Sequence, residues 1–114
     1  MPYIAVNTAK ALSQSERETV KSELGKLIRM LPNKSERVLM VDFCGGREIW
    51  LGGVKRENGA FVDVRLWGAC EPEAKKKFTE AVFSMLEKNI GSSPDSAYLT
   101  IGEYANWGSG GTLK

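Results

Sequence analysis

One strand–helix–strand pattern occurs twice in this chain of 114 residues, and the repetition limits its possible folds more than any single motif does. Apolar runs and alternating patterns predict strands at residues 2–7, 38–43, 60–67 and 97–101, with one amphipathic helix inside each half. Two such units can form one four-stranded mixed sheet with both helices on the same face. We therefore expect a single α+β domain over residues 1–114.

Local signals mark both ends of the two predicted helices. Ser13 and Glu16 have the spacing of a capping box, which favours a helix start at this point. Pro32 ends the apolar periodicity of that helix, because the residue before a proline rarely stays helical. Proline within the first turn favours a second helix start at Glu71–Glu73, and Gly91 is typical of its C-terminus.

The predicted strands differ in how many faces they bury. Residues 38–43 are almost all apolar, which predicts a strand covered on both faces. Residues 60–67 alternate, and Asp63, Arg65 and Trp67 share the face that carries charge, where subunit packing or a solvent channel is expected. The remaining expected elements are a short strand at 48–51 and a turn or hairpin in the glycine-rich segment 103–114.

The chain contains no histidine, and this excludes many familiar sites. Histidine-based metal sites, Ser–His and Cys–His nucleophile pairs, and the usual acid–base residue of neutral pH are all ruled out. Cys44 and Cys70 do not form a Cys-x-x-Cys pair, and we favour buried thiols over one disulfide. No metal and no cofactor are expected.

Charge and hydropathy argue against nucleic-acid and membrane partners. The net charge is only +2, and the one dense basic run, Lys75–Lys77, falls on a predicted helix whose face is expected to be solvated. No apolar run approaches the roughly 20 residues of a membrane span. The N-terminus shows no signal peptide, which favours a cytoplasmic location.

Pro2 directly follows Met1 and is the candidate base of the chain. A small residue at position 2 favours removal of Met1, which would turn the Pro2 nitrogen into a free secondary amine. Terminal amines titrate at about 7.7–8.0, and burial or a nearby cation lowers that pKa toward neutrality. The structural alternative is a proline at the start of a strand, where its missing N–H costs little.

A series of short motifs spans the whole chain in one order. They are Met1-Pro2-Tyr3-Ile4-Ala5-Val6-Asn7-Thr8, Leu31-Pro32-Asn33-Lys34-Ser35-Glu36, Val38-Leu39-Met40-Val41, Leu51-Gly52-Gly53, Leu66-Trp67-Gly68, Ser93-Pro94-Asp95 with Tyr98, and Ala105-Asn106-Trp107-Gly108. Together they resemble the tautomerase superfamily and, within it, the family of macrophage migration inhibitory factor (MIF) and D-dopachrome tautomerase. Each motif is short, so the specificity lies in their order and spacing.

This resemblance implies a homotrimer of β-α-β repeats with sites at the subunit interfaces. It implies an isomerase, a phenylpyruvate- or dopachrome-type tautomerase, that acts on a small enolisable α-keto acid. Pro2 would be the catalytic base, and Lys34 would bind the substrate carboxylate. Trp67 would contribute its backbone N–H, and Tyr98 would reach the site from a neighbouring subunit. Taken without the motif, Lys34 would be a surface lysine and Tyr98 a packing residue.

The residue types suit this chemistry, although the chain departs from the family pattern in two places. Tautomerisation needs a base of near-neutral pKa and a group that stabilises the developing enolate charge. Thr100 stands where the family often has asparagine, and its hydroxyl can still donate one hydrogen bond to the substrate. Ser109–Leu113 replaces a stretch that usually carries aromatic residues, which predicts a more open pocket.

Two other functions stay open at this point. The alternative is a MIF-like cytokine that acts on a cell-surface receptor, with vestigial tautomerase activity and export by a non-conventional route, and the two functions do not exclude each other. A dehalogenase or decarboxylase, as in other branches of the superfamily, is less favoured. Those enzymes tend to add arginines and an acid near the proline, and within the first fifteen residues Lys10 is the only charged one.

Overall fold

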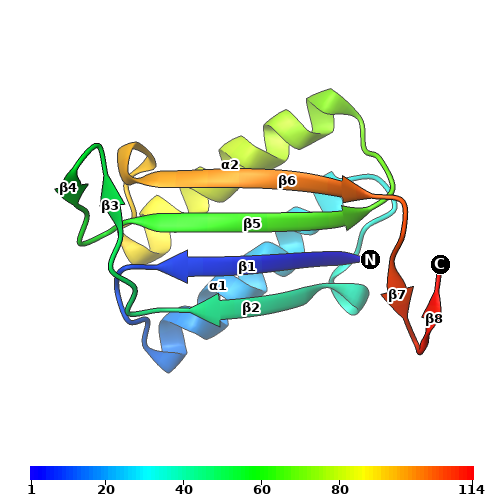
Figure 1. Ribbon diagram of the computed structural model, residues 1–114, viewed down its shortest axis with the longest axis horizontal. Helices are drawn as coiled ribbons and strands as arrows, with labels where there is room; N and C mark the ends of the chain where they lie inside the picture. Colours follow the sequence, from blue (N-terminus) through cyan, green and yellow to red (C-terminus); the bar gives the residue numbers. More distant parts are fainter.

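The computed structural model describes residues 1–114 (Figure 1). The strands are β1 (Pro2–Thr8), β2 (Met40–Cys44), β3 (Trp50–Leu51), β4 (Val54–Lys55), β5 (Ala60–Trp67), β6 (Ala97–Tyr104), β7 (Gly108–Ser109) and β8 (Thr112–Leu113). The α-helices are α1 (Gln14–Leu27) and α2 (Pro72–Ile90), and the short 3₁₀ helices are η1 (Ile28–Met30), η2 (Glu36–Val38) and η3 (Pro94–Ser96).

The main sheet has four strands in the order β2-β1-β5-β6, and both α-helices lie behind one of its faces (Figure 1). β1 is parallel to β2, β5 is parallel to β6, and the two central strands are antiparallel. The register pairs Pro2 with Leu66 and Thr8 with Ala60. The expected mixed sheet of two β-α-β units is therefore confirmed, and the two units run in opposite directions.

The core lies between the sheet and the two α-helices. Alternate residues of β1 and β5, namely Ile4, Val6, Val62, Val64 and Leu66, are at most 1% exposed. They pack against the apolar stripes of the helices, which include Val20, Leu24, Phe78, Val82 and Leu86. Full burial of one such side chain stabilises the fold by about 1.5–3 kcal/mol, so this layer holds the strands in place.

The helix ends follow the local signals in the sequence. Ser13 caps α1, and both reciprocal bonds of the capping box form, since Glu16 N–H donates to the serine hydroxyl and Ser13 N–H donates to the Glu16 carboxylate. Gly91 ends α2 in the left-handed conformation, with φ of 70°, where any side chain would be strained. No helix is both long enough and apolar enough to span a membrane.

The expectation of a strand at 38–43 covered on both faces is wrong. Val38 belongs to the 3₁₀ helix η2, and the strand begins at Met40, which is 65% exposed. β2 lies at the edge of the sheet, and the helices cover only one face. The side chains of this strand therefore alternate between two faces of the sheet. Val41 and Phe43 pack against the core, whereas Met40 and Asp42 lie on the open face.

The open face of the sheet carries polar and aromatic side chains. The Tyr3 hydroxyl donates to Asp42 Oδ2 at 2.9 Å, and Arg65 Nη2 lies 3.0 Å from Asp63 Oδ2. The Arg65 guanidinium lies 5.8 Å from the centroid of the Tyr3 ring, within the range of a cation–π contact. The mixed character expected for this face is confirmed, and in the single chain no element covers it.

Candidate active site

Pro2 lies at the start of β1, buried, beside the end of β5. The Trp67 N–H donates to the carbonyl of Met1 at 3.3 Å, which continues the antiparallel pairing of the two strands by one residue. In the chain that carries Met1, the Trp67 N–H is therefore occupied, and the Pro2 nitrogen is a peptide nitrogen.

Lys34 reaches the same point from the loop that follows α1. Asn33 adopts φ of 63°, a left-handed conformation that asparagine tolerates better than most residues, and this turns the chain back toward the sheet. The Lys34 N–H donates to the Leu31 carbonyl at 3.2 Å, and the Nζ ammonium donates to the Trp67 carbonyl at 2.9 Å. The structure thus brings three predicted residues together: Pro2, Lys34 and Trp67.

The surroundings of the terminal amine favour its neutral form. Burial lowers the pKa of the Met1 amine below its ordinary value of 8.0, and the positive charge of Lys34 lowers it further. Cys70, on the turn after β5, acts in the opposite direction. The lowered pKa increases the share of the amine that is neutral, and only the neutral amine can accept a proton.

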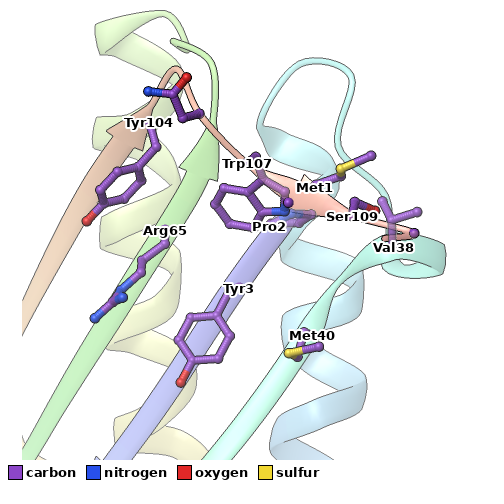
Figure 2. Close-up of a pocket in the computed structure, with 12 residues that line it drawn as sticks. Met1, Pro2, Tyr3, Val38, Met40, Arg65, Tyr104, Trp107 and Ser109 are labelled. Carbon is purple, nitrogen blue, oxygen red and sulfur yellow. The ribbon is translucent and has the colours of Figure 1, made fainter. Parts of the chain in front are cut away.

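A cavity of about 740 Å³ opens beside Pro2 (Figure 2). Three aromatic residues line it, Tyr3, Tyr104 and Trp107, and Arg65 is the only lining residue with a charged side chain. Its other lining residues are Met1, Val38, Met40, Asn106, Gly108, Ser109 and Gly110. Aromatic walls with few polar groups are typical of sites that bind small molecules.

The aromatic wall depends on a glycine. Tyr104, Arg65 and Tyr3 lie in a row across neighbouring strands in Figure 2. The Tyr104 ring covers Gly102, which pairs with Arg65, and a Cβ at position 102 would lie only 2.8 Å from that ring. A side chain there would therefore displace Tyr104 from the cavity.

Sequence reasoning missed Tyr104 as a lining residue and placed Arg65 only on a sheet face. The reason is that the last long strand was expected to end at Ile101, whereas β6 continues to Tyr104. The alternation of β5 and the N-terminal strand did contain a signal for Arg65, since Tyr3 and Arg65 are register partners on one face. The expected hairpin near the C-terminus forms as β7 and β8, and its Ser109 and Gly110 border the cavity.

Tyr98 and Thr100 lie away from Pro2 within the chain. On β6, Tyr98 pairs with Phe61 and Thr100 pairs with Asp63, whereas Pro2 lies beside Leu66 near the other end of β5. Tyr98 is 60% exposed, and Thr100 is exposed on the same face. One chain does not bring these two residues to the cavity, so a contribution from them requires a second chain.

The site has no recognisable place for a metal ion. No group of three or more cysteine, aspartate or glutamate side chains has the arrangement of a metal site. Cys44 and Cys70 are both free thiols, as the sequence favoured, but both are half-buried and not fully buried as expected. The chemistry available at this site is therefore that of a terminal amine, an ammonium, a guanidinium and backbone N–H groups in an aromatic cavity.

Comparison with solved structures identifies the fold. The structure superimposes on MIF2 of Leishmania major with a TM-score of 0.92 and 23% identity, over 100% of this chain and 97% of that one. A MIF-like protein of Entamoeba histolytica matches with a TM-score of 0.86 and 16% identity, over 99% and 98% of the two chains. A member of the cis-3-chloroacrylic acid dehalogenase family matches at 0.80 and 18%, over 97% and 82%.

These neighbours have the fold of MIF and of the wider tautomerase superfamily, so the fold expected from the sequence motifs is confirmed. No family model and no curated protein sequence matches the chain. The fold alone accommodates more than one chemistry, since a dehalogenase family is among its members. The choice of reaction must therefore come from the side chains of the site.

Proposed function

We propose that this chain is a keto–enol tautomerase of the MIF type that acts on phenylpyruvate or a similar enolisable α-keto acid. The observation that carries the proposal is the position of Pro2, which is buried at an aromatic cavity and follows Met1, whose terminal amine feels the charge of Lys34. Removal of Met1 would make the Pro2 nitrogen a terminal amine in the surroundings that lower the pKa of the Met1 amine.

Removal of Met1 would also open the site. The Met1 residue lines the cavity, and its carbonyl occupies the Trp67 N–H at 3.3 Å. Once it is gone, the Trp67 N–H becomes free to donate to a substrate oxygen, and the space beside Lys34 becomes accessible. Binding and catalysis thus depend on the same processing step.

The reaction moves one proton between oxygen and carbon. Lys34 attracts the substrate carboxylate, and the Trp67 N–H stabilises negative charge on the substrate oxygen. The neutral Pro2 amine takes the proton from the enol hydroxyl and delivers it to the neighbouring carbon as the keto form is made. The amine ends neutral, so no other reactant is needed.

Tyr98 and Thr100 enter this proposal through a homotrimer. Both side chains lie on the open face of the sheet, away from the Pro2 of the same chain. In the proposed trimer, one subunit presents them to the cavity of its neighbour, where their hydroxyl groups contact the substrate. The open sheet face and the edge strands β2 and β6 are the surfaces available for such an assembly.

The test is the ultraviolet assay of phenylpyruvate ketonisation, made on protein whose intact mass shows that Met1 is absent. Pro2→Gly should lower kcat/KM by about 100-fold or more, because the positioned base contributes on the order of 10²–10⁴. Pro94→Gly changes a proline of η3 and should leave activity unchanged. Full activity in Pro2→Gly, with a normal oligomer, would overturn the proposal.

A further inference from the structure

The cavity beside Pro2 has one charged side chain in its lining, Arg65, and the proposed reaction does not use it. Arg65 lies on the open face of β5 and pairs with Tyr3, one residue beyond the pairing of Pro2 with Leu66. Figure 2 shows that its side chain extends away from Pro2, so the guanidinium lies on the far side of the cavity. A ligand whose reacting end lies at Pro2 therefore has its other end toward Arg65.

The Arg65 guanidinium is held in one orientation. Its Nε and Nη2 groups both donate to Asp63 Oδ2, at 3.2 and 3.0 Å. Its central carbon lies 5.8 Å from the centroid of the Tyr3 ring. The register partner of Arg65 on β6 is Gly102, and the Tyr104 ring covers this glycine in place of a side chain. Because these contacts already restrict the arginine, less conformational entropy is lost when a ligand binds to it.

These contacts leave one edge of the guanidinium free. Asp63 takes the edge formed by Nε and Nη2, whereas Nη1 has no hydrogen-bond partner within the chain. The Arg65 side chain is 52% exposed, so the edge formed by Nη1 and Nη2 is open to a ligand. Two N–H groups on one edge match the two oxygens of a carboxylate and form a bidentate, charge-assisted pair with it.

The acids near Arg65 do not compete for this edge. Asp63 is bonded on the other edge, and Asp42 accepts the Tyr3 hydroxyl at 2.9 Å. Neither aspartate lines the cavity. Asp63 weakens the positive field of Arg65, but one carboxylate cannot use all five N–H donors of a guanidinium. Arg65 therefore offers the cavity a positive edge with unused donors.

We propose that Arg65 is a specificity-determining residue that binds a second carboxylate, at the end of the substrate opposite its keto acid. Three aromatic side chains line the same cavity, so the preferred substrate is an aromatic α-keto acid that carries a carboxylate on its ring. Phenylpyruvate, which lacks the second carboxylate, is then a poorer substrate. The inference rests on the proposed function for the reaction at the keto-acid end, whereas the second carboxylate is tested by binding alone.

The experiment is calorimetry with two ligands that differ only in the second carboxylate, cinnamate and 4-carboxycinnamate, on protein that lacks Met1. Wild-type protein should bind the diacid about 10-fold more tightly, as expected for hydrogen bonds between charged groups. Arg65→Gln should bring the two Kd values together and leave the Kd of cinnamate unchanged. Arg29→Gln, in the exposed part of η1, makes the same change in net charge and should keep the preference for the diacid.

Equal Kd values in wild-type protein, or a preference that persists in Arg65→Gln, would overturn the inference. Loss of cinnamate binding in Arg65→Gln would also overturn it, because Arg65 would then bind the first carboxylate. Neither ligand has a keto group, so the measurement does not depend on turnover. A preference that requires Arg65, in protein that ketonises nothing, would contradict the tautomerase function and support the second carboxylate site.

Discussion

At both ends of the central strand pair, β1 and β5, a side chain donates a hydrogen bond to a backbone carbonyl. One of these bonds belongs to the candidate active site, and the other only stabilises the fold. At one end, which we call the amine end (Met1, Pro2, Lys34 and Trp67), Lys34 Nζ donates to the Trp67 carbonyl at 2.9 Å. At the other, the serine end (Asn58, Ala60 and Ser92), the Ser92 hydroxyl donates to the Asn58 carbonyl at 2.8 Å. Lys34 and Ser92 each stand two residues before a 3₁₀ helix that leads into an edge strand.

The difference is in what surrounds each bond. Ser92 is 3% exposed, and Asn58 returns a bond from its side-chain amide to the Gly91 carbonyl at 3.1 Å, which closes the serine end with neutral groups. Lys34 instead places a charge near the terminal amine of Met1, a residue that lines the open cavity. The repeated β-α-β unit thus supplies two equivalent positions from which a side chain bonds to a backbone carbonyl. The lysine at one position contributes to the candidate active site, and the serine at the other contributes to stability.

The largest effect expected from this contrast is on activity at the amine end. Lys34→Ala removes the ammonium that attracts the substrate carboxylate, and hydrogen bonds to charged groups contribute about 1.5–3 kcal/mol. We expect kcat/KM for phenylpyruvate to fall by about 10- to 100-fold, measured on protein without Met1. Lys76→Ala, on the exposed side of α2, is the control and should keep full activity.

A second prediction concerns Tyr98, which lies toward the serine end of its own chain. If a neighbouring subunit supplies it to the cavity, Tyr98→Phe should lower kcat/KM by about 10-fold through loss of one hydrogen bond. Steady-state kinetics on the purified oligomer measures this loss. A wild-type kcat/KM in Tyr98→Phe would show that the Tyr98 hydroxyl does not contact the substrate. The amine end would then act without a contribution from Tyr98.

Mixing two inactive variants tests whether Pro2 of one chain and Tyr98 of another form a shared site. Chains carrying Pro2→Gly and chains carrying Tyr98→Ala should regain activity when they are unfolded and refolded together, because some interfaces then combine an intact Pro2 with an intact Tyr98. Two batches of Pro2→Gly protein treated in the same way should stay inactive. Absence of recovery in mixed oligomers would argue against a shared site.

The serine end should respond in stability and not in activity. Ser92→Ala removes the hydrogen bond from the buried Ser92 hydroxyl to the Asn58 carbonyl, which should cost about 0.5–1.5 kcal/mol of the free energy of unfolding. Urea unfolding measures this change, and Ser84→Ala on the exposed face of α2 is the control. A loss of activity at unchanged stability would contradict the division of roles between the two ends.

The smallest expected effect is on the pH profile. Activity requires the neutral amine, so kcat/KM should rise with pH along a limb whose midpoint lies below 8.0, because burial and Lys34 lower the pKa of the Met1 amine and the Pro2 amine would take its surroundings. Removing Lys34 removes one of these causes, so the amine pKa should rise. The acidic limb of the profile should therefore move to higher pH by a few tenths of a unit, as expected for one nearby charge in a water-like medium. The residual activity of Lys34→Ala, followed from pH 5 to 9, measures the shift.

Local signals predicted the scaffold well. The bounds of β5, the cap at Ser13 and the left-handed Gly91 could all be read from the sequence, because alternation, capping and glycine each depend on near neighbours. The number of buried faces of β2 could not be read from the sequence, because a nearly continuous apolar run does not reveal how many faces the rest of the chain will bury.

The site was predictable only in part. Pro2, Lys34 and Trp67 could be named from their motifs, although the 2.9 Å bond that joins Lys34 to Trp67 spans 33 residues and depends on the loop at Asn33. Tyr104 was missed because β6 extends three residues beyond its apolar run, and that extension is stabilised by pairing with β5. The anchoring role of Ser92 has no local signal at all.

The central claim is that the Pro2 amine, exposed by removal of Met1, is the base. The most direct measurement compares phenylpyruvate ketonisation by two preparations of the same chain, one with Met1 retained and one with Met1 removed, each verified by intact mass. We predict activity only in the preparation without Met1, since Met1 converts the Pro2 nitrogen to an amide and occupies the Trp67 N–H. Equal activity in both preparations would contradict the account.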